Sequence, residues 1–563
     1  MIRSNLNKLK AINYKRAATF AIAVFLLVCL IFCPDLVFFL KNGVYNYAIA
    51  GIIIVTMLLL VPIVLFSYNL KIYYYILAFI AALTPIAVLP VFLINSLPNT
   101  EMLGLVLETN SHEAMELMGW KMLIVPLIMI AFFVAFLLIS KRLPRKVNFK
   151  KAALISLVSL CCFLVIPFLR STALVYYVPT IKNTFKAYYP FRIGDAISYM
   201  SSELKNVDNY KKTVANFSFD AKETKKDSAR KITILVIGET ARYDHWSING
   251  YNRETSPNLA KQQNLITFSD VSSSGPMTHL SIPLIITRAD ATDYDMHKQE
   301  RSVLGAYKEC GYKTFWISNQ SKYGLTGNIG MHYNDADTTI FDGWGSNENN
   351  YKGSYDSCLL PAINNVIDNN KSRNIFILVH TIGSHWRYLL RYPTEFTKFQ
   401  PVSDRNRTLV GYPPDNIMIN EYDNSILYTD YILNQIIEIV KSKNAESSVT
   451  YVSDHGENLN DNNNHLYFHS FNPTKYTAHV PLFIWTSNRY KQANPDKFQN
   501  LESHKSLPIS SGANVFFTLL DMSHISIKQE SNDKKSIASD HFKGDPQLII
   551  DENGKPVPYK SLK

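Results

Sequence analysis

Hydrophobic residues follow two different patterns along the chain. The first part holds long apolar runs, whereas the remainder alternates shorter apolar runs with segments of helical period. A membrane span needs about 20 apolar residues. Five runs meet or approach this length, and they cover 17–33, 47–66, 72–94, 122–139 and 152–169. We therefore expect residues 1–170 to form a transmembrane domain with five helices, the first of which can extend through Pro34 into the sequence DLVFFL.

The second pattern predicts an α/β domain over residues 231–563. Its strand-like runs are KITILVIG (231–238), YKTFWISN (312–319), NIFILVH (374–380), SVTYVSDHG (448–456) and HVPLFIW (479–485). Segments of helical period lie between them, at 299–311 and 420–443. Near-continuous apolar strands alternating with helices indicate a mostly parallel sheet sandwiched by helices. The stretch 171–230 between the two domains mixes aromatic and charged residues, which favours interfacial helices followed by a polar linker.

Charge gives the orientation in the membrane. Lysine and arginine are concentrated at the amino end and in the loop 140–151 between the fourth and fifth spans, whereas the loop between the third and fourth spans is acidic. Cytoplasmic loops carry the excess of lysine and arginine, so we expect a cytoplasmic amino terminus and an exported large domain. In a bacterium this means a multi-pass inner-membrane protein with a periplasmic domain. The net charge of +11 partly reflects this topology, and no basic motif with interleaved aromatics indicates nucleic-acid binding.

Cysteine usage leaves one question open. Four of the six cysteines fall within or beside the predicted spans, which leaves Cys310 and Cys358 for the exported domain. An oxidising compartment permits a bridge between them, and two separate thiols are equally compatible with the sequence. A thiolate metal site is not expected, because the chain has no C-x-x-C pair.

Three predicted strands end in residues that can bind a metal. The first delivers Glu239, the third His380 with His385 close behind, and the fourth Asp454 and His455. Taken alone, the stretch ILVIGETAR is typical of a helix start, with Glu239 in a first turn. Parallel strands, however, place their carboxyl ends at one edge of the sheet, where ligands bind. Oxygen and nitrogen donors without thiolate suit Zn²⁺, with Mn²⁺ as a competitor.

A candidate nucleophile lies between the first two strands. In SSSGPMTHLSIPL (272–284), Gly275 and Pro276 predict a turn that presents Thr278. A threonine hydroxyl is a poor nucleophile, but metal coordination lowers the pKa of such a group. A metal cluster beside a threonine is therefore a coherent site for phosphoryl transfer.

Several blocks together resemble a known family. VIGETAR, NGYNRETSPNL, GYKTFWISNQS, GSHWRYLLRYP, EYDNSILYTD and YVSDHGENL are similar to those of bacterial phosphoethanolamine transferases in the alkaline phosphatase and sulfatase superfamily. KTFWISNQ and SHWRYLLRYP are closest to the branch that modifies the heptose core of lipopolysaccharide. The resemblance implies a monomeric, Zn²⁺-dependent enzyme that takes phosphoethanolamine from phosphatidylethanolamine in the bilayer and transfers it to lipopolysaccharide, favouring core heptose over a lipid A phosphate.

The resemblance also implies residue roles. The metal ligands would be Glu239, Thr278, Asp454 and His455, and Thr278 would be the nucleophile that carries phosphoethanolamine in a covalent phosphothreonine intermediate. His385 and either His465 or His469 would transfer protons; spacing does not choose between the last two. Substrate-binding residues would be Asn110, Glu113, Asn319, Gln320, Lys322 and His380.

The chain departs from the family's lipid A enzymes near the nucleophile. Those enzymes usually place cysteines on both sides of this loop, and here the matching positions are near Ser274 and Leu284. We therefore expect the loop to be braced by packing alone, and the assignment to lipid A is weakened.

Other functions compete with this interpretation. A polyglycerolphosphate synthase of the same superfamily would also have five spans, a threonine and a metal, and a phosphotransferase acting on a periplasmic glucan would share the same intermediate. A sulfatase is disfavoured, because SGPMTHL lacks the arginine of the Cys/Ser-x-Pro-x-Arg signature. An inactive membrane sensor or scaffold would be expected to have lost at least one ligand, and none is missing.

Topology can be tested with reporter fusions. If the positive-inside rule holds for this chain, a reporter fused after Lys563 should be active only in its exported form. A reporter inserted in the loop 141–151 should behave as cytoplasmic. The reverse pattern would place the metal site in the cytosol and contradict the predicted orientation.

Overall fold

A computed structural model gives the fold. It describes residues 20–41, 45–93, 124–165, 188–194, 197, 205, 209–225, 229–320, 328–341, 355–405, 413–469, 472–528, 532–551 and 554–563. The predicted substrate residues Asn110, Glu113 and Lys322 lie outside these ranges. The described residues fall into two compact units, one over residues 20–197 and the other over residues 205–563. We call them the helical unit and the α/β unit.

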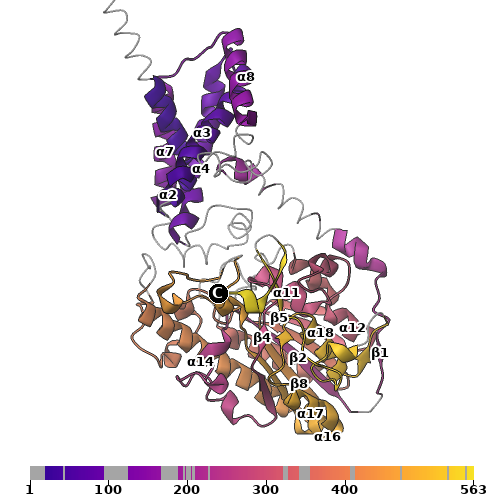
Figure 1. Cartoon of the computed structure of the whole chain (residues 1–563). Coiled ribbons are helices and arrows are strands. Elements are labelled where there is room, and N and C mark those ends of the chain that lie inside the picture. The colour runs from indigo at the N-terminus through magenta and orange to yellow at the C-terminus, as the bar shows by residue number, and fades with distance from the viewer. Residues whose placement is uncertain are drawn as a thin grey trace, which may run out of the picture. The chain divides into compact units, whose positions relative to one another are not determined.

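The helical unit contains helices over all five predicted apolar runs. A helix over Phe20–Ile31 is followed by α2 (Cys33–Lys41), α3 (Tyr45–Leu60), α4 (Leu70–Leu93), α7 (Ile124–Ser140) and α8 (Phe149–Val165) (Figure 1). Among the described residues, only Leu70–Val88 is by itself long and apolar enough to span a membrane. The first helix and α2 pass the same test only as a bent pair. The count of five spans therefore remains a prediction.

The first predicted span is not straight. Its two helices meet at an angle of 79°. Pro34 lies just after the break, and a proline ring removes one helical hydrogen bond and clashes with the carbonyl four residues earlier. The extension through Pro34 is therefore a separate helix and does not continue the first one.

The α/β unit is built on a seven-stranded sheet. Its strand order is β3 (Leu265–Phe268), β9 (Leu482–Thr486), β8 (Glu446–Ser453), β2 (Lys231–Gly238), β7 (Ile375–His380), β5 (Lys313–Ser318) and β6 (Thr338–Phe341). The five strands from β8 to β6 are parallel, which agrees with the mostly parallel sheet predicted from the sequence. β9 and β3 extend it in antiparallel fashion.

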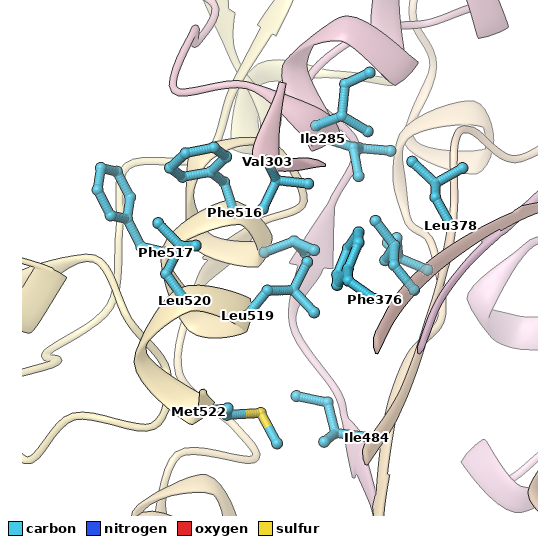
Figure 2. Close-up of a cluster of buried hydrophobic side chains, with 14 of the residues drawn as sticks. Ile285, Val303, Phe376, Leu378, Ile484, Phe516, Phe517, Leu519, Leu520 and Met522 are labelled. Carbon is cyan, nitrogen blue, oxygen red and sulfur yellow. The ribbon is translucent and has the colours of Figure 1, made fainter. Parts of the chain in front are cut away.

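Helices cover both faces of this sheet. One face packs against α11 (Thr278–Ile286), α12 (Val303–Glu309) and α18 (Ala513–Met522). Figure 2 shows α18 turning Phe516 and Leu519 towards Phe376 and Leu378 of β7. The other face packs against α13 (Leu359–Asn369) and α14 (Asp415–Lys441). Burial of each large apolar side chain contributes about 1.5–3 kcal/mol. The central strands are therefore firmly packed, and they fix the positions of the residues at their carboxyl ends.

The two cysteines of the α/β unit do not form a bridge. Cys310 packs against the hydrophobic cluster on the α18 face, and Cys358 against the cluster on the α14 face. The sheet lies between these clusters, whereas a disulfide requires the two Cα atoms to lie within about 7 Å of each other. Burial raises the pKa of Cys310 to about 12, which keeps that thiol in its unreactive form.

Strand register sets the position of the candidate site. Ile237 pairs with His380 on β7, and Gly238 pairs with Ser453 on β8. The residues that follow these strands, Glu239 and Asp454, are thereby brought to the same edge of the sheet.

Substitution of Gly238 can test how closely β2 and β8 pack at this edge. A Cβ atom at position 238 would overlap the ring and hydroxyl of Tyr451, so Gly238→Ala should destabilise the protein by about 1–3 kcal/mol through overpacking. Tyr451→Leu removes the overlapping atoms. In thermal unfolding of the full-length protein, the double variant should lose less stability than the sum of the two single variants. Simple additivity would contradict the overlap.

Candidate functional site

Three buried side chains meet at the ends of β2 and β8. Glu239 follows β2, and Asp454 and His455 follow β8. Each offers one ligand atom, and these atoms lie within 4.8 Å of one another. No helix starts at Glu239, since the next helical turn begins at Tyr243. The alternative interpretation of ILVIGETAR as a helix start is therefore wrong.

Thr240 connects the two carboxylates. Its backbone N–H donates to Asp454 Oδ1 at 3.1 Å, and its hydroxyl donates to Glu239 Oε1 at 2.8 Å. The residue has a φ of 62°, a left-handed conformation that is unusual for a β-branched side chain. Gly383 leaves room for the Glu239 backbone, because a Cβ at position 383 would lie 2.9 Å from the Glu239 carbonyl oxygen. Sequence analysis missed Thr240, although its place directly after a proposed ligand was the available signal.

Thr278 opens helix α11 and faces this cluster. Its Oγ1 lies 3.2 Å from Glu239 Oε1 and 3.2 Å from His455 Nε2. The predicted turn is thus corrected in part: the chain turns at Gly275 and Pro276, but Thr278 is already the first residue of a helix. A helix amino terminus carries partial positive charge that favours an anion such as a phosphate.

Serine hydroxyls brace the chain before Thr278. Ser273 Oγ donates to the carbonyl oxygen of Asp454 or that of Gly275, and Ser281 Oγ donates to the Gly275 carbonyl at 2.6 Å. The hydroxyls of Ser274 and Ser510 lie 2.7 Å apart. The expectation that packing alone braces this loop is therefore wrong, because buried hydrogen bonds do so as well.

The cluster has the electrostatic character of a cation site. Burial, and then the neighbouring Glu239, raise the pKa of Asp454 to about 7. Burial alone would lower the pKa of His455, but Asp454 and then Glu239 raise it. Burial alone would raise the pKa of Glu239, but His455 lowers it. The cluster thus holds two buried carboxylates, Glu239 and Asp454, beside one imidazole that can carry a positive charge, so a bound cation would balance the second negative charge.

The donor geometry fits the same interpretation. Asp454 Oδ2 is buried without a hydrogen-bond partner among the described residues. The His455 Nδ1 lies 2.8 Å from the Gly456 carbonyl, so Nδ1 keeps its proton, and a cation that displaces the other ring proton would bind at Nε2. Metal-binding histidines typically have this arrangement. The residues present therefore fit a divalent cation that prefers oxygen and nitrogen donors.

The fold brings His469, and not His465, to the cluster. The rings of His469 and His455 lie 4.1 Å apart. His469 Nδ1 is 3.1 Å from Glu457 Oε1, which is buried and also accepts a hydrogen bond from the Tyr388 hydroxyl through Oε2. His465 is exposed on the preceding loop. Glu457 is a second residue that sequence analysis missed, although it stands within the SDHGE motif.

His385 lies on the loop after β7. The Ser384 N–H donates to the Glu239 carbonyl at 3.0 Å, and His385 is near enough to lower the pKa of Glu239. The His385 Nδ1 lies 2.6 Å from the Trp386 carbonyl, so Nδ1 carries the proton and Nε2 is available as a base.

The predicted head-group residues have different surroundings. Gln320 is partly exposed and donates through Nε2 to Glu239 Oε2 at 3.4 Å and to the Thr381 carbonyl at 3.1 Å. Asn319 and His380 are fully buried. The Asn319 amide donates to Asp356, which also accepts from the N–H groups of the loop that leads to His385. Neither of these two side chains is accessible to solvent.

Comparison with known proteins places this site in a family. The sulfatase family model matches residues 231–525, more than half of the chain. Phosphoethanolamine transferase EptA of Salmonella typhimurium is 32% identical over 311 residues, which are 53% of this chain and 54% of that protein. The chain spans about half the length of the curated relatives it matches.

Two solved structures extend the likeness. The periplasmic domain of Escherichia coli EptC, in complex with Zn, has a TM-score of 0.54 and 26% identity over 61% of this chain and 96% of that one. Lipooligosaccharide phosphoethanolamine transferase A of Neisseria meningitidis has a TM-score of 0.72 over 92% of this chain and 97% of that one, and at 23% identity it shows a shared fold. The chain therefore belongs to the sulfatase family, and the relatives reported above are phosphoethanolamine transferases by name.

Proposed function

We propose that this protein transfers phosphoethanolamine from phosphatidylethanolamine to lipopolysaccharide, with core heptose as the favoured acceptor. The observation that carries the proposal is the position of Thr278: its hydroxyl stands at a helix amino terminus, 3.2 Å from both Glu239 and His455. A hydroxyl held between a carboxylate and an imidazole, beside a partial positive charge, is suited to attack a phosphate diester. The relatives named for the same reaction support the substrate class.

Zn²⁺ is the proposed metal, held by Glu239, Asp454, His455 and Thr278. The Zn complex of the EptC domain supports this choice. Bound there, zinc would lower the pKa of the threonine hydroxyl and stabilise negative charge on the phosphate oxygens. Thr240 would keep both carboxylates in place, since it donates to one oxygen of each.

The reaction would proceed in two half-reactions. Thr278 Oγ1 attacks the phosphorus of phosphatidylethanolamine, the bond from phosphorus to the diacylglycerol oxygen breaks, and Thr278 carries the phosphoethanolamine as a phosphothreonine. An acceptor oxygen then attacks the same phosphorus and releases Thr278. The amino terminus of α11 would stabilise the anionic phosphate in both steps.

His385 and His469 would move the protons. Both have an Nδ1 that faces an acceptor, the Trp386 carbonyl and the Glu457 carboxylate, so each neutral ring presents a bare Nε2. One of these atoms takes the proton that Thr278 loses and delivers it to the leaving diacylglycerol oxygen, and later takes the proton of the acceptor hydroxyl. Glu457 would orient His469 for this task.

Donor binding would involve the predicted substrate residues. Gln320 borders Glu239 and is partly exposed, so it is suited to contact the head group, together with Lys322, Asn110 and Glu113. Asn319 and His380 are fully buried, so they would support the residues that contact the donor and would not contact it from solvent.

The helical unit would be the membrane part. Along its helices, large apolar side chains such as Phe79, Leu127 and Leu154 are more than 60% exposed, and lipid would cover such a surface. We therefore place residues 1–170 in the inner membrane as five spans, 171–230 at its surface, and 231–563 in the periplasm. The protein would act as a monomer.

The metal site predicts a defined loss of zinc. Asp454→Ala or His455→Ala removes one donor and leaves the other charged groups unbalanced, so each variant should lose the most tightly bound zinc of the purified full-length protein, about one ion per chain. The fold should persist, because the sheet core is unchanged. Elemental analysis and circular dichroism measure the two outcomes. A variant that keeps its zinc would show that these residues do not hold it.

The covalent mechanism predicts a modified threonine. Incubated with phosphatidylethanolamine alone, the wild-type protein should release diacylglycerol and gain one phosphoethanolamine on the peptide that contains Thr278, as measured by mass spectrometry. Thr278→Ala should do neither, because it lacks the hydroxyl; Thr278→Ser keeps the hydroxyl and should retain some activity. In a deletion strain, wild type but not Thr278→Ala should restore phosphoethanolamine on the lipopolysaccharide core. Near-normal transfer by Thr278→Ala would rule out the phosphothreonine step, and restoration on lipid A instead of the core would reassign the acceptor.

A further inference from the structure

Two buried histidines form a second cluster in the α/β unit, and the proposed reaction uses neither of them. His297 lies in the helical turn η8 (Tyr294–Lys298), and His332 lies in η9 (Gly330–Asp335). Both are fully buried, and their ring centroids are 6.1 Å apart. Asn328, at 7% exposure, is their neighbour.

The proton of His297 can be assigned from its partner. Its Nδ1 lies against the carbonyl oxygen of Tyr294, which can only accept, so Nδ1 carries the hydrogen. Burial, and then the nearby His332, lower the pKa of His297 to about 3, so the ring is neutral. Its Nε2 is therefore a bare lone pair.

The neutral form of His332 has the same arrangement. Its Nδ1 is 3.0 Å from the Tyr210 hydroxyl. That hydroxyl also contacts Asp335 Oδ2 at 3.0 Å and the Glu300 carbonyl at 3.2 Å. Both of these atoms only accept, so the hydroxyl proton goes to one of them, and Nδ1 of His332 must donate to the tyrosine oxygen. Its Nε2 is then also a lone pair.

Three acceptor atoms are left without a hydrogen bond. They are His297 Nε2, His332 Nε2 and Asn328 Oδ1, and none of them has a partner among the described residues. His332 lowers the pKa of His297, and the Asn328 side chain, which is within hydrogen-bond reach of the ring, raises it, so both side chains lie beside His297. A buried polar atom without a partner destabilises the fold, so the three acceptors call for a group that can pair with their lone pairs.

We propose that His297, His332 and Asn328 form a second divalent-metal site, for zinc or a cation of the same class. Metal-binding histidines donate their other ring N–H to a carbonyl or into a carboxylate network, and both rings do so here. Zinc about 2.0–2.1 Å from each Nε2, at a tetrahedral angle, would place the ring centroids roughly 5 Å apart. The two rings, whose centroids are 6.1 Å apart, would therefore close by about 1 Å on binding. A single water has only two protons for the three acceptors.

The surroundings also suit a cation. Asp335 Oδ2 lies 3.4 Å from His332 Nδ1. The carboxylate therefore contacts a proposed ligand on the side away from the metal, and it would offset part of the metal charge. Imidazole nitrogen with neutral oxygen is a donor set that zinc, copper and nickel accept. The absence of a directly bound carboxylate predicts weaker binding than at Glu239 and Asp454.

This site is linked to the start of α11 through one residue. Tyr294 accepts from His297 through its carbonyl, and its hydroxyl donates to the carbonyl of His279 at 3.1 Å. The Asn328 amide donates to the same hydroxyl at 2.7 Å. Because His279 directly follows Thr278, a metal that fixes His297 and Asn328 also fixes the first turn of the helix that carries the nucleophile.

Zinc counting tests the proposal on the full-length protein in detergent. After removal of metals with a chelator, the protein is dialysed against buffers of increasing free zinc, and bound zinc is measured by mass spectrometry. We expect about two ions per chain in two steps, the second at higher free zinc. His297→Gln and His332→Gln should each lose only the second step, and Asp454→Ala combined with His455→Ala should lose only the first.

His504→Gln is the matched control. His504 is a buried histidine whose Nδ1 lies 2.8 Å from the Ile537 carbonyl, and its replacement should leave both steps intact. If the double variant of Asp454 and His455 binds no zinc, or if the wild type shows a single step, the three acceptors hold only an internal water and the proposal is wrong. That outcome does not require the histidine variants to fold, and it leaves the proposed transfer reaction untouched.

Discussion

The whole site depends on holding two carboxylates close together out of water. Glu239 and Asp454 are almost fully buried, and parallel pairing of Gly238 with Ser453 brings them to the same level of the sheet. Like charges at this separation repel strongly in a low-dielectric interior, so the arrangement survives only if positive charge is supplied. His455 supplies part of it. A slip of one residue between β2 and β8 would turn every side chain to the opposite face and separate the pair.

Backbone strain at Thr240 also helps to hold the two carboxylates together. The left-handed conformation lets one residue donate to both carboxylates, and such strain persists only where the surroundings hold it. The Tyr422 hydroxyl of α14 donates to the Thr240 carbonyl at 2.7 Å and accepts from the Arg242 N–H at 2.9 Å. Helix packing on one face of the sheet is thus linked directly to the candidate site by hydrogen bonds.

Sequence reasoning succeeded where burial is simple. β2, β5, β7 and β8 were predictable because central parallel strands are apolar on both faces. The direction of β9 was not, since an apolar run carries no information on its partner, and the four-residue edge strands β3 and β6 are too short to show a period. The helix α11 was hidden because THLSIPLII contains Pro283 and is apolar nearly all round, so that no amphipathic period marks it.

The finer parts of the site depend on contacts between distant segments. Spacing alone could not choose between His465 and His469, which differ in the structure because only His469 reaches Glu457 and His455. Thr240 and Glu457 stand inside recognised motifs, but their roles follow from the atoms they meet. The same holds for His297 and His332, which are far from any motif and come together only through the fold.

The serine bracing before Thr278 has a consequence for where this protein can work. Ser273, Ser274, Ser281 and Ser510 hold that loop by hydrogen bonds, and no cysteine lies between residues 272 and 286. A loop held by a disulfide depends on oxidising surroundings and on the catalysts that form the bond. Here the shape of the loop is independent of the thiol chemistry of the compartment, so the threonine keeps its position when oxygen is scarce or reductant is present.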